Sequence, residues 1–516
     1  MNDTTSEQLS GNSVILGPDQ NIAFDFGVLG TPAFRWPAAP LLHYDLHMGW
    51  THFAIQQYAV NPTPGNKALF LKKGLYLWMA QWLYLRHLQN IIQKQNIPGL
   101  SLLSAATGIH QDSIQHLVTS RYDQTGRLKR FIFRNLQIVG MRIVDALRLP
   151  RPLLRINNIP LPKTISYAWD YRIRNPYCFL DRPEKLNADE EQSLQETMQK
   201  CREYFQNFQE EHRMEVSMAE FSGMLEAVML PQMRTAIMDY KYLYKILHGR
   251  PLDCFLGSLG GYTATLLAMI AKETGGRVHS NQHADYPYWI VNALTLVDLV
   301  NADMFYCRSR PAAHRFMAGI QDYPVQFNCR INHIESAEWH HPLINTHPFG
   351  GKIRSIMVMG TPITPELPRC NLAMAIILDF HIRLIRLLQS WGYRVIYKAH
   401  PDGTWKNEES LFGANVPVER RPYEHVWHEA DACLILLSRS TTTMLALRTD
   451  RPIYYFWHPD IDPYSLAAMD LWRRRCEVLD LTFDAANRML FDEARLQATL
   501  ADPKPLDVES ILQLTT

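Results

Sequence analysis

Lys398, His400 and Pro401 stand where an apolar stretch, 395–397, gives way to polar sequence. The carboxyl ends of strands in an open parallel sheet are the usual place for ligand contacts. A lysine supplies positive charge there, and a histidine can donate to a phosphate oxygen or protonate a leaving group near neutral pH. This stretch therefore predicts either one wall of a phosphate-binding site or an ordinary exit from a strand.

The His-Pro dipeptide is not informative by itself, because the chain holds three further pairs: His341–Pro342, His347–Pro348 and His458–Pro459. Only the position of His400 at the end of the apolar run distinguishes this pair from the others. We therefore interpret His400 and Pro401 as site residues because of their place in the predicted fold.

A run of hydroxyl side chains follows a second apolar segment, 432–437, at the predicted start of a helix. The candidate residues of this run are Ser438, Arg439, Ser440, Thr441 and Thr442. The first turn of a helix offers backbone N–H groups to an anion, hydroxyls add neutral donors, and an arginine adds a cation. Plain helix capping needs only one Ser or Thr. The surplus favours ligand binding.

The segment 280–289, "SNQHADYPYW", contains two candidates for a general base, His283 and Asp285. A histidine with a purely structural role is the alternative for this window. The glycines of "GSLGGYTA", 257–264, match neither the dinucleotide fingerprint nor the phosphate loop, which lacks its lysine here. They favour close packing of a helix, with room for a phosphate group as the alternative.

Motifs for metal-dependent or serine-nucleophile chemistry are not found in the sequence: it holds no HExxH, GxSxG or EF-hand pattern. His425 and His428 are three residues apart but have no third ligand nearby in sequence. The acidic pair of "DID", 460–462, is better explained as a surface loop. We expect neither a metal site nor a cofactor.

The elements that must position these residues alternate between short apolar runs and helical segments from Leu252 onward. A strand over 353–359 leads to Gly360 and Thr361, which we expect at the same ligand site as His400. Further strands are predicted within 253–261, 277–283, 304–309, 392–401, 431–440 and 451–457. Such alternation predicts βαβ units. The fold class is therefore α/β, with two doubly wound Rossmann-like domains facing a cleft and a large helical N-terminal elaboration.

Domain bounds follow from changes in pattern along the chain. We predict a flexible leader over 1–20, an N-terminal domain over 21–345 and a C-terminal domain over 346–516. Helical spacing covers 64–145 and 187–248 within the N-terminal domain. Asn187 or Asp189 is the expected N-cap of the second helical part, and 151–177 is expected to be irregular because prolines interrupt it.

Composition limits the classes of function. The 516 residues are 47% apolar and carry a formal charge of +1, which argues against a dedicated nucleic-acid binder. Eight scattered cysteines without a CxxC pair indicate reduced thiols. The polar start lacks a signal peptide, and no apolar run reaches the roughly 18–20 residues that span a bilayer. We expect a cytoplasmic protein and leave open a peripheral contact with the inner face of the cell membrane or with an assembly.

The second block resembles the donor-binding domain of GT-B glycosyltransferases of bacterial surface and capsular polysaccharide synthesis. The resemblance is nearest to sialyl- and Kdo-transferases, with CDP-glycerol glycerophosphotransferases close behind. It rests on "YKAHP", "ADACLILLSRSTTT" and "ALRTDRPIYYF". The similarity covers about 253–457 and is strongest after Arg354.

This resemblance implies a role for each matching residue. His400 and Pro401 match a His-Pro motif, and Ser440 and Thr441 match a Ser-Ser/Thr pair; both contact nucleotide phosphates in the family. His283 would be the base of the first domain. The resemblance also makes 21–345 the acceptor side and 346–516 the nucleotide-sugar side.

The sequence departs from the family in ways that leave the donor open. Ala284 replaces a glycine, and Met444 and Leu445 stand where UDP-sugar enzymes often place a ribose-binding Glu. The donor is therefore CMP-, CDP- or UDP-linked, and the acceptor a carbohydrate or lipid-linked glycan. The alternatives are a polyol-phosphate transferase or sugar epimerase of the same fold, or a non-catalytic binding subunit of a glycosylation assembly.

Overall fold

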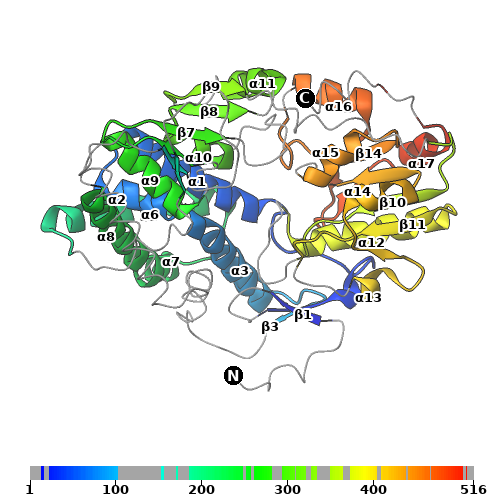
Figure 1. Cartoon of the computed structure of the whole chain (residues 1–516). Helices are drawn as coiled ribbons and strands as arrows, with labels where there is room; N and C mark the ends of the chain where they lie inside the picture. Colours follow the sequence, from blue (N-terminus) through cyan, green and yellow to red (C-terminus); the bar gives the residue numbers. More distant parts are fainter. Residues whose placement is uncertain are drawn as a thin grey trace, which may run out of the picture.

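In a computed structural model, the described residues of the chain form a mixed α/β fold with two six-stranded sheets. The structure describes residues 13–16, 22–102, 153–155, 170–172, 185–247, 251–256, 261–281, 293–307, 310–320, 327–333, 349–363, 372–403, 408–436, 440–464, 466–503 and 507. Figure 1 shows the two sheets on opposite sides of the molecule.

The sheet of the C-terminal half has the order β12-β11-β10-β13-β14-β15, and every neighbouring pair is parallel. Its strands are β10 (Ser355–Met359), β11 (Arg394–Lys398), β12 (Val418–Glu419), β13 (Ala432–Ile435), β14 (Ile453–Trp457) and β15 (Glu477–Asp480). The central strands are almost continuously buried, as expected where helices cover both faces. The helices of this half are α12 (Met374–Ser390), α13 (Glu409–Phe412), α14 (Tyr423–Val426), α15 (Thr441–Leu447), α16 (Leu466–Arg475) and α17 (Glu493–Ala501).

The sheet of the N-terminal half is also fully parallel, with the order β5-β4-β6-β7-β8-β9. Its strands are β4 (Leu153–Arg155), β5 (Asp170–Arg172), β6 (Cys254–Phe255), β7 (Val278–Asn281), β8 (Met304–Cys307) and β9 (Arg330–His333). The helices α9 (Tyr262–Glu273), α10 (Ala293–Val300) and α11 (Arg310–Ile320) connect them. The prediction of parallel α/β blocks is thus confirmed, while a cleft between them stays a prediction.

Two strands of this sheet correct the sequence analysis. β4 and β5 lie within 151–177, the stretch expected to be irregular. Pro152 directly precedes β4, where it can begin a strand although it cannot donate to the sheet ladder. Each strand has only three residues, too few to show a periodic pattern in the sequence. The two pair with each other directly in parallel.

Helices occupy much of the chain before β6. They are α1 (Leu42–Val60), α2 (Pro64–Leu71), α3 (Tyr76–Lys94), α6 (Ala188–His212), α7 (Met218–Met224) and α8 (Leu230–Ile246). Asn187 caps α6 as predicted, in a capping box with Glu190. No helix among the described residues is long and apolar enough to cross a membrane.

A small antiparallel sheet begins the described chain, with β1 (Ser13–Leu16), β2 (Ile22–Asp25) and β3 (Leu100–Leu102). β1 falls within the predicted flexible leader and pairs with β2 in full register. The rest of the predicted leader lies outside the described residues.

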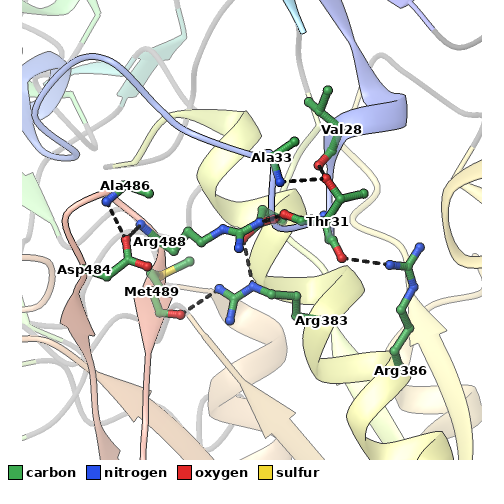
Figure 2. Close-up of polar contacts among 11 residues, drawn as sticks. Val28, Thr31, Ala33, Arg383, Arg386, Asp484, Ala486, Arg488 and Met489 are labelled. Atoms are coloured by element: carbon green, nitrogen blue, oxygen red, sulfur yellow. Dashed lines mark hydrogen bonds and ion pairs between the residues drawn. The ribbon is translucent and has the colours of Figure 1, made fainter. Parts of the chain in front are cut away.

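The segment after β2 packs on the C-terminal half, across the predicted domain boundary. Figure 2 shows the side chains of Arg383, Arg386 and Arg488 gathered around the turn at Thr31. Arg386 donates to the Gly30 carbonyl at 3.0 Å, and Arg488 donates to the Thr31 carbonyl. This turn of the N-terminal segment is therefore held by α12 and by the hairpin of β16 (Thr482–Phe483) and β17 (Met489–Leu490).

Asp379 lies at the centre of this junction and is fully buried. Its carboxylate accepts from the Gly30 N–H at 2.9 Å, from Arg383 Nε at 2.8 Å and from Arg488 Nη2 at 3.2 Å. Gly30 has a φ of +68°, and a Cβ there would lie 2.5 Å from Ile382 Cγ2. Only glycine fits this position without strain.

Candidate functional site

The candidate site starts from three strand ends that lie in register. Met359 of β10 pairs with Lys398 of β11 on one side and with Ile435 of β13 on the other. Because the strands are parallel and about 4.8 Å apart, the residues that follow them emerge at one edge of the sheet. Gly360 and Thr361, Lys398 and His400, and the carboxyl end of β13 are thus brought together.

Gly360 allows β10 and β11 to approach closely at this edge. Its N–H donates to the Lys398 carbonyl at 2.8 Å. A Cβ on residue 360 would lie 2.5 Å from Tyr397 Oη and 2.8 Å from the Lys398 carbonyl oxygen. Such distances exclude any side chain without movement of the strands, which gives Gly360 a structural role. Thr361 beside it is buried.

Lys398, the last residue of β11, is buried, with its Nζ donating to the Ala399 carbonyl at 3.0 Å. Burial lowers the pKa of its ammonium group, whereas the nearby carboxylates of Glu419 and Glu424 oppose that shift. Arg421 forms ion pairs with Glu419 and, at 2.7 Å, with Glu429. Part of the negative charge near Lys398 is therefore already neutralised.

His400 is half-buried in a tight turn that begins directly after the strand. Its Nδ1 accepts the Asp402 N–H at 3.2 Å, and its carbonyl accepts the Gly403 N–H at 3.3 Å. Because Nδ1 is an acceptor, the neutral ring carries its proton on Nε2. His400 can therefore act as a hydrogen-bond donor through Nε2, which is the role a phosphate oxygen requires. Pro401 is exposed and begins the turn.

Ser440 acts as the N-cap of α15. Its Oγ accepts the Thr443 N–H at 3.1 Å and lies 2.9 Å from Thr443 Oγ1. The capping interpretation thus accounts for this hydroxyl without a ligand. Thr442 is half-buried in the first turn of α15 and is not used by that cap. It is the described hydroxyl of the run that remains a candidate donor.

Arg475 positions α15, and sequence reasoning missed it. Its guanidinium is buried and donates to the carbonyls of Leu447 at 3.0 Å, Thr449 at 2.8 Å and Arg451 at 3.0 Å. The sequence signal was a run of three arginines, 473–475, which ordinarily indicates a solvated face. Only the fold reveals that the last of the three satisfies the carboxyl end of α15.

Several predicted site residues lie outside the described residues: His283, Asp285, Ser438 and Arg439. Thr441 begins α15, and its side chain is likewise outside the description. β7 ends at Asn281, so His283 follows the carboxyl end of that strand by two residues. These roles therefore stay predictions.

In the described part of the chain, no three His, Cys, Asp or Glu side chains lie close enough together to hold a metal ion. The chemistry that the described edge offers is anion binding, through the lysine, the Nε2 donor of His400, a threonine hydroxyl and backbone N–H groups.

Comparison with known proteins gives no family. No protein-family model matches the chain. No curated protein matches it in sequence.

Solved structures show only a weak likeness. UGT89C1 from Arabidopsis thaliana has 12% identity and a TM-score of 0.34, with 58% of this chain and 73% of that chain covered. The α,α-trehalose 6-phosphate synthase from Burkholderia multivorans has 10% identity, a TM-score of 0.30 and coverage of 58% and 73%. A GtfA/B complex has 11% identity and a TM-score of 0.29. The match covers 55% of this chain and 52% of the GtfA/B chain, so this chain spans about half the length of that structure. Likeness at this level does not assign a function, so the proposed function rests on the chain's own residues.

Proposed function

We propose that the protein is a GT-B-type glycosyltransferase, which moves a sugar from a nucleotide-activated donor to a carbohydrate or lipid-linked glycan acceptor. The proposed pathway class is surface polysaccharide or glycoconjugate synthesis, supported by the sequence resemblance around "YKAHP" and "SRSTTT". The donor nucleotide would occupy the C-terminal half and the acceptor the N-terminal half.

One observation carries the proposal: the ends of β10, β11 and β13 lie in register. A ligand across this edge would meet Lys398 and His400 together with the first turn of α15. Positively charged and neutral donors that converge at strand ends suit a nucleotide diphosphate. A histidine with a purely structural role would not need a lysine and further hydrogen-bond donors beside it.

The proposed reaction assigns each group one task. His283 or Asp285 would remove the proton of an acceptor hydroxyl, whose oxygen then attacks the anomeric carbon of the donor sugar. The bond between that carbon and the nucleotide phosphate oxygen breaks. The Nε2–H of His400, with Lys398 and Thr442, would stabilise the charge that develops on the leaving diphosphate. We infer that this charge stabilisation makes the reaction independent of a metal.

A thermal-shift panel with CMP, CDP, UDP and GDP tests the proposal first. A nucleotide at about 100-fold its Kd stabilises the folded protein by about 2.7 kcal/mol, which is readily measured. Sugar-nucleotide hydrolysis, followed with and without a chelator, then tests catalysis and metal independence. Failure of every nucleotide to raise Tm would contradict the proposal.

Two variants localise the effect. His400→Asn keeps an oxygen that can accept the Asp402 N–H as an Asx-turn and removes the Nε2 donor. Thr442→Val removes a hydroxyl that the helix cap does not use. Both should reduce the nucleotide-induced shift, whereas His425→Asn, on α14, should leave it unchanged.

The alternatives give distinct results in the same assays. A polyol-phosphate transferase would respond to CDP and transfer from a CDP-polyol, and an epimerase would convert a sugar nucleotide without an acceptor. A non-catalytic subunit would show neither hydrolysis nor transfer.

A further inference from the structure

The sequence His-Pro-Asp occurs at two strand ends of the C-terminal sheet, at 400–402 and 458–460. The first follows β11, and the second follows β14 directly. The interpretation that only His400 among the His-Pro pairs ends a strand is therefore wrong. The sheet order places β10 and β13 between these two strands.

The two turns have the same internal hydrogen bonds. His458 Nδ1 accepts the Asp460 N–H at 3.2 Å, the distance also found from Asp402 N to His400 Nδ1. The His458 carbonyl accepts the Ile461 N–H at 3.1 Å, as the His400 carbonyl accepts from Gly403. Each turn thus fixes its histidine through Nδ1 and leaves the proton of the neutral ring on Nε2.

The surroundings of His458 leave that donor unused. Its side chain is 15% exposed, and its ring packs against Phe483 with the ring centres 5.3 Å apart. The Asp460 carboxylate lies 3.9 Å from Nδ1, too far for a hydrogen bond. Within the described part of the chain, Nε2 of His458 has no recorded hydrogen-bond partner.

We propose that His458 is a second ligand-binding residue of the candidate site, donating its Nε2–H to a hydroxyl oxygen of a sugar ring. The inference rests on the proposed function. β11 and β14 are three strand spacings apart, or about 14 Å. Two histidines at that spacing cannot hold the same phosphate, so the second donor meets a part of the ligand beyond the phosphate at His400. A sugar nucleotide offers ring hydroxyls on both sides of its phosphates, on the ribose and on the transferred sugar.

Two substitutions separate ligand binding from turn formation. His458→Asn keeps an oxygen near the place of Nδ1, where it can accept the Asp460 N–H, and lacks a donor at the position of Nε2. His458→Gln places an amide donor near the position of Nε2. The probes are inorganic phosphate, CDP, UDP and GDP, with CDP-glucose, UDP-glucose and GDP-mannose, titrated by calorimetry.

We expect His458→Asn to keep the wild-type Tm and to lose about tenfold in affinity for the sugar nucleotide that wild type binds, the value of one hydrogen bond. His458→Gln should restore part of the loss, and phosphate affinity should not change. Loss for both the diphosphate and its sugar conjugate assigns the contact to the ribose, whereas loss for the conjugate alone assigns it to the transferred sugar. If the His458→Asn variant does not fold, nitrogen NMR of the wild-type imidazole rings tests the contact instead. The Nε2 resonance of His458 must shift when the sugar nucleotide binds.

Unchanged affinity in a folded His458→Asn variant, or an Nε2 resonance that ignores the ligand, overturns this inference. If His400→Asn weakens binding in the same series, the proposed function survives that result. No binding of any nucleotide to wild type overturns both.

Discussion

Replacing Asp379 by Asn should release the N-terminal segment from the C-terminal half. The Asp379 carboxylate is fully buried and accepts from the Gly30 N–H and from two arginines, Arg383 and Arg488. An asparagine of the same size has one acceptor oxygen and directs an NH₂ group at a donor. The two guanidinium groups, whose side chains are 23% and 15% exposed, then lose their counter-charge.

Removing one partner of a buried ion pair costs about 3–5 kcal/mol. Each kcal/mol shifts Tm by roughly 2–4 °C in a cooperative unit of about 150–250 residues, so the transition of the C-terminal half should fall by roughly 6–20 °C. Differential scanning calorimetry measures that shift. Hydrogen exchange of residues 26–38 reports the release directly, because those amides should lose protection more than the β10 amides do.

The matched control is Glu429→Gln, which removes an exposed ion pair with Arg421 at 2.7 Å. Such pairs contribute about 0–1 kcal/mol. Gly30→Ala disrupts the same junction on the side of the N-terminal segment and should lower Tm as Asp379→Asn does. A decrease in Tm for Asp379→Asn no larger than that of Glu429→Gln, with unchanged exchange over 26–38, would refute the reasoning.

Three further outcomes follow from the packing. Gly360→Ala should destabilise the protein by about 1–3 kcal/mol, because its Cβ would overlap Tyr397 Oη. Urea unfolding measures this loss of stability, and a variant as stable as wild type would contradict the close approach of β10 and β11. Arg475→Met should cost about 3 kcal/mol or more, because it leaves the carbonyl of Leu447 at the end of α15 and that of Thr449 just beyond it unsatisfied. Faster hydrogen exchange of α15 amides is the expected readout, and wild-type exchange would contradict this role of Arg475. Burial lowers the pKa of His381 to about 3. When the pH falls below the ordinary pKa of histidine, the unfolded chain binds a proton at this residue and the folded chain does not. The free energy of unfolding therefore falls by about 1.4 kcal/mol per pH unit on acidification. His381→Leu should flatten the dependence of Tm on pH between about 6.5 and 4, and an unchanged slope would contradict a neutral buried ring.

Elements with strong local signals were predictable from sequence. The helix α6 carries its capping box in residues 187–190, and the central strands of the C-terminal sheet are continuous apolar runs. β4 and β5 were missed because a strand of three residues carries too little periodic pattern.

The candidate site was predictable in part. The residue types at Lys398 and His400 indicated anion binding, but the register that joins them to Gly360 depends on pairing between distant segments. Ser440 illustrates the reverse case, since its capping role appears only with the Thr443 N–H in place. The role of Arg475 could not be predicted, because its partners are backbone carbonyls, which carry no sequence signal. The i,i+4 spacing of Asp379 and Arg383 indicates an ion pair, but the contacts of Asp379 with Gly30 and Arg488 join segments that are far apart in the chain.

Hydrogen exchange with and without a nucleoside diphosphate tests the central claim most directly, because it locates the binding site. Binding at the edge formed by β10, β11 and α15 predicts that protection increases at residues 360–361, 399–403 and 442–443, with little change at α14. Absence of protection at these residues, or protection confined to the N-terminal sheet, would contradict the account.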